Sequence, residues 1–271
     1  MPADMNELAD DLAAESAVVR GLVAGLDEPG WRQDTPAPGW SIADQISHLA
    51  HFDDAAVKSA AEPESFRADM VGLAEMGGLD PDTIAKRYRA IPPAALLDWF
   101  DSARARLLDT FRPMDPSARV PWFGVQMSAA SSLTARIMET WAHGQDIADT
   151  LGVRREPTAR LRHVAHIGIS ARPFSFAANG LPVPEQPVRI ELIAPGGGDM
   201  WLWGPPGAAD RVAGSALDFC LAVTQRRHID DTSLVISGPV ATEWMSIAQA
   251  FAGPPGPGRR PGQFRRGPAG W

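Results

Sequence analysis

Cysteine is nearly absent from this 271-residue sequence. Cys220 stands alone, so no disulfide can form within the chain, and its apolar neighbours indicate a small buried thiol rather than a nucleophile. Long hydrophobic runs are missing too. No stretch approaches the roughly 20 apolar residues that span a bilayer, and the acidic N-terminus has no apolar segment typical of a secretion signal. These absences predict a cytoplasmic protein with no membrane partner.

Lysine is also rare in the sequence. Lys58 and Lys86 are the only lysines among 25 basic residues, so nearly all of the positive charge is carried by arginine. Lysine codons are rich in A and arginine codons in G and C, so this bias indicates a high-GC genome. The 33 acidic residues give a formal net charge of −8 at pH 7, and a protein of this charge repels phosphate backbones. We therefore expect no nucleic-acid partner, and the sequence leaves the oligomeric state open.

The length of the chain favours two domains, since single domains usually span about 100–200 residues. Apolar residues at three-, four- and seven-residue spacing predict four long helices in the first half. Ser41 and Asp44 have the spacing of a capping box, and Gly152 suits the position after a helix end. Residues 62–91 form a long crossover with one short helix, 81–90. We predict a four-helix bundle over residues 1–153, with its helices at 5–26, from Ser41 onward, at 93–111 and at 128–151.

The second half has a different pattern. Strand-like alternation over residues 188–192 precedes a Pro-Gly-Gly-Gly-Asp turn. We predict a small α+β domain over residues 154–252 and therefore an α+β fold for the whole chain. Residues 253–271 are rich in Gly, Pro and Arg and predict an extended or disordered tail, which could wrap back through Phe264 and Trp271. The further predicted elements are helices at 157–178, 215–226 and 239–253, a short strand at 234–236 and a hairpin at 188–203. We expect Pro173 to kink the first of these helices or to end it early.

Two side chains in the fourth predicted helix have the spacing of metal ligands. Glu139 and His143 are four residues apart, about one helical turn, so both leave the same face. His48 on the second helix can supply a third ligand across the bundle, and Asp146 a fourth ligand or a carboxylate that orients an imidazole. The alternative is a solvated helix face, which such a pair often marks, and we expect His51 to be a surface residue. Two imidazoles and one carboxylate suit zinc, nickel, iron or manganese.

Two segments resemble a known family. Residues 39–49, GWSIADQISHL, resemble the signature helix of the DinB-like superfamily, and residues 138–147, METWAHGQDI, resemble the fourth helix of its mycothiol-dependent maleylpyruvate isomerase branch. The resemblance implies a DinB-like four-helix bundle in which His48, Glu139 and His143 bind one divalent ion, usually zinc. Three protein ligands leave a coordination position open, and an open site favours catalysis or ligand capture over a purely structural role.

The second half resembles the same branch less closely. Residues 211–227 resemble its C-terminal domain, a small α+β unit similar to sterol-carrier folds. This likeness implies that Arg226 and Arg227 bind the thiol or an acidic substrate, because a guanidinium pairs well with a carboxylate. The alternative is that both arginines complement the negative end of a helix dipole. Together with Asp146 they are the candidates for catalytic roles. The tail departs from the isomerase pattern, so the resemblance leaves the substrate open.

The resemblance implies a metal-dependent enzyme that uses mycothiol, a low-molecular-weight thiol, for transfer to, or isomerisation of, a small electrophilic and acidic substrate. A divalent cation in the site stabilises a thiolate over a thiol. Two alternatives are a metal-dependent hydrolase or lyase in which water replaces the thiol, and a non-catalytic metal-binding protein. Trp40 and Trp141 lie near the ligands in sequence, where we expect core packing ahead of a role in walling the site.

Overall fold

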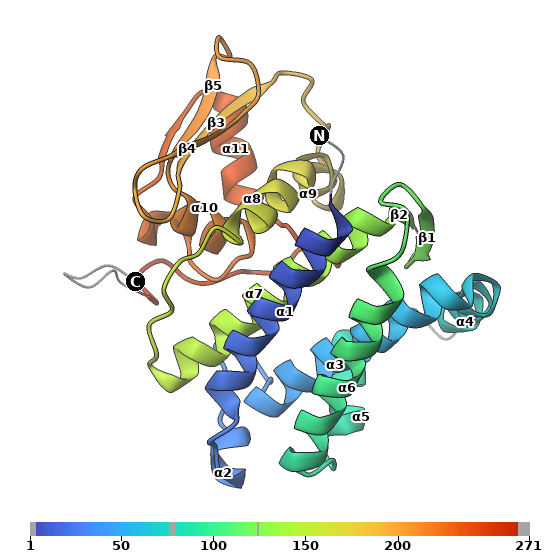
Figure 1. Cartoon of the computed structure of the whole chain (residues 1–271). Coiled ribbons are helices and arrows are strands. Elements are labelled where there is room, and N and C mark those ends of the chain that lie inside the picture. Colours follow the sequence, from blue (N-terminus) through green and yellow to red (C-terminus); the bar gives the residue numbers. More distant parts are fainter. Residues whose placement is uncertain (1–3, 76–79, 124, 265–271) are drawn as a thin grey trace. The chain divides into compact units, whose positions relative to one another are not determined.

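The computed structural model describes residues 4–75, 80–123 and 125–264. The chain divides into two compact units, Met1–Val153 and Arg154–Trp271. Helices dominate the first unit, and the second combines helices with a four-stranded sheet (Figure 1). The predicted α+β fold class is confirmed. Within the described ranges, every helix is too short or too polar to cross a bilayer.

Four long helices form the predicted bundle in the first unit. They are α1 (Met5–Val23), α3 (Ile42–Ala61), α6 (Pro93–Phe111) and α7 (Ala129–Leu151). Helix α3 packs against α6 and α7, and α1 packs against the same two helices (Figure 1). Local sequence sets the helix ends. Ser41 and Asp44 exchange backbone-to-side-chain hydrogen bonds in the predicted capping box. Gly152 ends α7 at a φ of 64°, a conformation that glycine adopts without steric cost.

The segments between the bundle helices differ in part from prediction. They contain α2 (Glu28–Trp31), α4 (Pro63–Glu75), the predicted short helix α5 (Pro81–Tyr88), and a hairpin of β1 (Arg119–Trp122) and β2 (Val125–Ser128). The sequence pattern predicts neither α4 nor the hairpin, because contacts between distant segments hold both. Phe66 of α4 is buried and stacks on Trp122 of the hairpin, with ring centroids 6.1 Å apart.

A layer of buried polar side chains divides the bundle core. One apolar cluster is built around Leu49 and Phe100, and the other around Leu107 and Ile137. On each bundle helix, polar residues fall at or beside the change from one cluster to the other. They are Glu15, Ser16, Asp53, Arg104, Arg136 and Thr140. Glu15, which interrupts the apolar pattern of the first helix, is also buried. Burial lowers the pKa of the Arg104 guanidinium, and the negative charge of Glu15 opposes this lowering.

The second unit is built on a sheet with the strand order β4-β3-β5-β6. Its strands are β3 (Val188–Ile193), β4 (Met200–Trp203), β5 (Asp210–Ser215) and β6 (Val235–Ser237). The predicted hairpin is present: β3 pairs antiparallel with β4, and Ile193 lies opposite Met200. Strand β5 lies parallel to β3 and antiparallel to β6. The sequence pattern does not predict β5, because only Asp210 and Val212 of this strand are buried and the apolar alternation is weak.

Short helices complete the second unit. They are α8 (Leu161–Ser170), α9 (Arg172–Ala178), α10 (Ala216–Val223) and α11 (Pro239–Ile247). Helices α10 and α11 pack against β5, and α10 also packs against α8. The helix expected at 157–178 is broken at Ala171, just before Pro173, which removes a backbone donor. The expected ends of the last two helices were too late: α10 ends at Val223 and α11 at Ile247.

Residues 254–264 form no helix or strand and belong to the second unit. The backbone amide of Gly262 donates to the carboxylate of Asp231 at 2.8 Å. The guanidinium carbon of Arg227 lies 4.1 Å from the ring centroid of Phe264, a cation–π contact. The tail therefore wraps back through Phe264, one of its two expected anchors. The other, Trp271, lies outside the described residues.

Candidate metal centre

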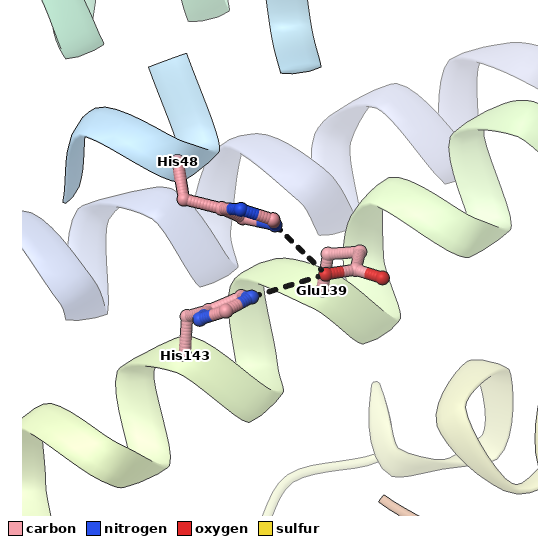
Figure 2. Close-up of side chains that lie close together, drawn as sticks. All are labelled: His48, Glu139 and His143. Carbon is pink, nitrogen blue, oxygen red and sulfur yellow. Dashed lines mark hydrogen bonds and ion pairs between the residues drawn. The ribbon is translucent and has the colours of Figure 1, made fainter. Parts of the chain in front are cut away.

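Three side chains from two bundle helices meet at one point. Figure 2 shows His48 reaching from α3 toward Glu139 and His143, which leave successive turns of α7. Oε2 of Glu139 lies 3.5 Å from Nε2 of His48 and 3.1 Å from Nε2 of His143. The candidate ligand atoms of the three residues all lie within 4.8 Å of one another. The structure thus brings together the three residues that the sequence singles out as metal ligands.

These separations suit a single divalent ion. Two donor atoms that each lie about 2.1 Å from a tetrahedral ion are about 3.4 Å apart, close to the 3.1 and 3.5 Å observed. Imidazole nitrogen and carboxylate oxygen are ordinary ligands for zinc, and they also suit nickel, iron and manganese. The residues therefore fit the ion that the sequence predicts, and three protein ligands leave one tetrahedral position for an exchangeable partner.

The cluster is largely withdrawn from water. His48 and His143 are each 9% exposed. Burial, followed by the charge of His143, lowers the pKa of His48 from 6.5 to about 3, so this imidazole is neutral near pH 7. Neutral imidazole is the form that binds a metal. Burial by itself raises the pKa of Glu139, but hydrogen bonds with His143 and His48 outweigh it and hold this pKa well below the usual value. Glu139 is therefore ionised, which is the form in which a carboxylate binds a metal ion.

Gln45 determines which nitrogen of His143 carries the proton. Its Oε1 is hydrogen-bonded to Nδ1 of His143, and its Nε2 donates to Oγ1 of Thr35 at 2.9 Å. The Thr35 hydroxyl donates in turn to the backbone carbonyl of Trp40 at 2.8 Å. Because that hydroxyl proton is already used, the Thr35 oxygen accepts from the Gln45 amide, and the amide carbonyl must face the imidazole. Nδ1 of His143 is therefore protonated, which leaves Nε2 as the nitrogen that faces Glu139 and that can bind a metal ion.

The contact between His143 and Glu139 requires either a proton or a metal ion between the two groups. An imidazole lone pair and a carboxylate oxygen 3.1 Å apart repel each other unless a proton or a metal ion lies between them. His48 faces the same carboxylate oxygen, so one divalent ion can satisfy all three groups. A histidine ligand that donates its other ring nitrogen to a protein acceptor is the usual arrangement in zinc sites. Among the described residues, Nδ1 of His48 has no comparable acceptor, so Gln45 gives this support to His143 alone.

Aromatic rings enclose the two imidazoles. Trp40 stacks on His143, with ring centroids 5.9 Å apart and an interplanar angle of 15°, and its ring lies 5.2 Å from that of His48. Phe52 lies 4.5 Å from the His48 ring. Nε1 of Trp40 donates to the carboxylate of Asp82 in α5 at 2.6 Å. Trp40 therefore walls the cluster, whereas the sequence favours core packing for this residue.

The remaining first-unit candidates lie outside the cluster. Asp146 is fully buried about one turn beyond His143 on α7 and is not among the three grouped residues. Its catalytic role stays a prediction. His51, expected at the surface, is partly buried, and its Nδ1 lies 3.0 Å from the hydroxyl oxygen of Tyr88. Trp141 is buried, in agreement with core packing.

Arg226 and Arg227 belong to the second unit and follow α10. The guanidinium of Arg226 donates to the carbonyl of Thr224, and that of Arg227 donates to the carbonyl of Arg226, both at 2.7 Å. Thr224 is the residue that caps the C-terminus of α10, so the Arg226 guanidinium lies at the carbonyl end of that helix, where positive charge is favourable. A role for either arginine in binding the thiol or substrate stays a prediction.

Sequence reasoning missed the residues that support the cluster. Gln45 precedes His48 by three positions and shares its helix face, a spacing that could have found it. Asp53, Arg104 and Arg136 are charged residues on helix faces that also carry buried apolar residues. A charged residue at such a position indicates that the side chain is buried against a partner, but it does not identify the partner.

The bundle and its cluster of two imidazoles and one carboxylate define a DinB-like protein. The sequence matches the family model described as the mycothiol maleylpyruvate isomerase N-terminal domain over residues 12–148. The match covers half of the chain, and the chain belongs to this family. A second family model, described as wyosine base formation, matches residues 184–236 in the second unit.

Two relatives come from Mycobacterium tuberculosis: the uncharacterized protein Rv0036c of strain H37Rv and the uncharacterized protein MT0041 of strain CDC 1551. Each is 45% identical over 257 residues, which cover 95% of this chain and 100% of the relative. The similarity therefore extends over both units.

Two crystal structures are also similar. A mycothiol-dependent maleylpyruvate isomerase gives a TM-score of 0.53 at 16% identity and covers 83% of this chain and 90% of its own. A point mutant of a mycothiol-dependent maleylpyruvate isomerase gives a TM-score of 0.56 at 16% identity and covers 88% and 97%. At this identity the likeness shows a shared fold.

Proposed function

We propose that the protein is a divalent-metal-dependent enzyme that activates mycothiol, either for transfer to a small electrophilic, acidic substrate or for isomerisation of that substrate. Membership of the mycothiol maleylpyruvate isomerase family supports the choice of thiol. The observation that carries the proposal is the metal-ligand geometry: His48 and His143 face one oxygen of Glu139 at 3.5 and 3.1 Å, and Gln45 fixes the tautomer of His143.

The side chains have separate tasks in this proposal. His48 and His143 donate neutral nitrogens, and Glu139 contributes the negative charge that offsets part of the charge of the cation. A bound divalent ion supplies the preference for thiolate over thiol. Trp40 and Phe52 cover the imidazoles, and the exclusion of water strengthens the electrostatic interactions inside the cluster.

In an isomerisation, the thiol loses its proton to solvent on entering the site. The sulfur then bonds to one carbon of a cis double bond, and the electron pair of that double bond moves to the neighbouring carbon, which is conjugated to a carbonyl group. The former double bond, now single, rotates. The carbon–sulfur bond then breaks, the trans double bond forms and the thiol regains its proton, so no atom is gained or lost. In a transfer, the carbon–sulfur bond persists, and the proton from the thiol adds to the neighbouring carbon. Arg226 and Arg227 are the proposed partners of a substrate carboxylate.

A reconstitution with Zn²⁺ tests the proposal. The metal-loaded protein is mixed with mycothiol and an unsaturated electrophilic acid such as maleylpyruvate, and products are followed by mass spectrometry. We expect an adduct or a trans isomer only when both metal and thiol are present. His143→Ala should abolish metal binding and product together, whereas His51→Ala, a histidine on α3 outside the cluster, should keep both.

Two outcomes would overturn the proposed function in different ways. Equal turnover of the substrate without any thiol would indicate hydrolysis or lyase chemistry in which water takes the place of the sulfur. Tight metal binding with no turnover of any small electrophile would indicate a non-catalytic metal-binding protein.

A further inference from the structure

We infer that Asp53 and Arg136 are positioning residues for the metal centre: their buried ion pair sets α3 against α7 so that His48 meets Glu139 and His143. The inference rests on the metal centre of the proposed function and is independent of its thiol chemistry.

One carboxylate joins the bundle helices. Asp53 on α3 accepts a hydrogen bond from Nε of Arg104 on α6 at 2.7 Å and from Nε of Arg136 on α7 at 2.9 Å. The Arg104 guanidinium also donates to Ser16 on α1 at 2.8 Å and to Thr140 on α7 at 3.0 Å. All five side chains are buried. The four helices of the bundle are therefore tied together within one polar layer.

This layer contacts the helix turns that carry the ligands. The Nη2 of Arg136 donates to the backbone carbonyl of Leu49, the residue after His48, at 3.2 Å. On α7, Arg136 precedes Glu139 by three positions and shares its helix face. Thr140, the residue after Glu139, donates its hydroxyl proton to the carbonyl of Arg136 at 2.7 Å. A single guanidinium thus links the α3 turn of His48 to the α7 turn of Glu139.

A second tie between the same helices lies on the other side of His48. Gln45, three positions before His48, is hydrogen-bonded to His143, four positions after Glu139. Leu49, one position after His48, is bonded to Arg136, three positions before Glu139. His48 and Glu139 therefore lie between two directional contacts, and a slide of α3 along α7 by one residue, about 1.5 Å, would disrupt both.

Stability alone does not account for the polar layer. Removing charged groups from water costs free energy that their pairing often fails to recover, and apolar residues of similar volume frequently stabilise a protein as well or better. Apolar clusters flank the layer on both sides, so apolar side chains would be natural occupants. A buried polar contact instead specifies one register between helices, the best-attested role of such groups. Here that register is the one that brings the three ligands together.

Arg136→Lys is the direct test. Lysine keeps the positive charge but lacks the planar fork with which arginine reaches Asp53 and the Leu49 carbonyl at once. We expect a folded protein that binds one Zn²⁺ per chain with a dissociation constant raised about tenfold or more, measured by competition with a chromophoric chelator. The visible absorption bands of bound Co²⁺ should also shift, because the ligands no longer surround the ion in the same geometry.

Two control variants separate positioning from general stability. Leu107→Ala leaves a cavity in the apolar cluster that does not include Leu49, so it should lower the midpoint of urea unfolding and leave Zn²⁺ affinity and the Co²⁺ spectrum unchanged. Arg106→Lys alters an exposed α6–α3 ion pair with Asp54, the neighbour of Asp53, and should change neither property.

Wild-type affinity and spectrum in Arg136→Lys would overturn the inference, since the layer would then stabilise the bundle without shaping the centre. An equal loss of affinity in Leu107→Ala would overturn it too, because metal binding would then follow overall stability. A wild-type protein that binds Zn²⁺ but forms no thiol product would refute the proposed thiol chemistry and leave this inference standing. A wild-type protein that binds no metal would refute both.

Discussion

Replacing Gln45 with leucine should weaken Zn²⁺ binding about 10- to 100-fold. Leucine occupies a similar volume but cannot accept the Nδ1 proton of His143 or donate to Thr35. A buried donor that loses its partner costs about 1–3 kcal/mol, and each 1.4 kcal/mol is about a tenfold change in a binding constant. The cost falls on the metal-bound state, because Nε2 can bind the ion only while Nδ1 holds the proton. Without Gln45, the metal-free imidazole is released to adopt the other tautomer.

The assay is a competition titration of Zn²⁺ at fixed pH, with two comparison variants. Gln45→Glu keeps an acceptor for His143 and should retain Zn²⁺ affinity, although its carboxylate cannot donate to Thr35 and the fold should be less stable. Ser47→Ala removes another buried side-chain hydrogen bond of α3, from the hydroxyl to the carbonyl of Asp44 at 3.1 Å, without touching the imidazole. Wild-type affinity in Gln45→Leu, or an equal loss in Ser47→Ala, would refute the reasoning.

Two further predictions follow from buried groups. In the metal-free protein, folded His48 has a pKa of about 3 and stays neutral, whereas the unfolded chain takes up a proton below about pH 6.5. The free energy of unfolding should therefore fall as the pH drops from 6.5 toward 4.5, with His48 contributing about 1.4 kcal/mol per pH unit. Urea unfolding of His48→Asn over the same pH range should show a fall that is smaller by the His48 contribution. Identical pH slopes for the wild type and the variant would contradict this prediction. Burial raises the pKa of the Cys220 thiol well above its usual value. A thiol reagent at mildly alkaline pH should therefore react slowly with the native protein and rapidly with the denatured protein, at one thiol per chain. Rapid labelling of the native protein would contradict this prediction, because it would show that the thiol is accessible.

The bundle could be predicted because its signals are local. The capping box at Ser41, the apolar spacing of the long helices and Gly152 at the end of α7 are each set by a few neighbouring residues. The candidate ligands Glu139 and His143 follow from helical geometry alone. His48 lies on a different helix, so spacing within one helix could not select it. The predicted bundle offered it as a ligand from a second helix, the family resemblance favoured it, and its Nε2 lies 3.5 Å from Glu139.

The supporting residues could not be assigned in the same way, because their partners are distant in the sequence. Arg136 and Asp53 are 83 positions apart, and Gln45 and His143 are 98 positions apart. A buried charge in an apolar stretch indicates that some partner exists but does not identify it. Strand β5 and helix α4 were missed for a related reason: each depends on packing against another segment more than on its own pattern.

The hydrogen bond between Trp40 and Asp82 has a consequence for the surroundings of the candidate metal centre. This bond links the Trp40 ring, which covers both imidazoles, to Asp82 in the segment between α3 and α6. That segment supplies none of the three candidate ligands. Substitutions in this stretch can shift the tryptophan while leaving His48, Glu139 and His143 unchanged. The surroundings of the candidate metal centre can therefore change independently of the side chains that would hold the ion.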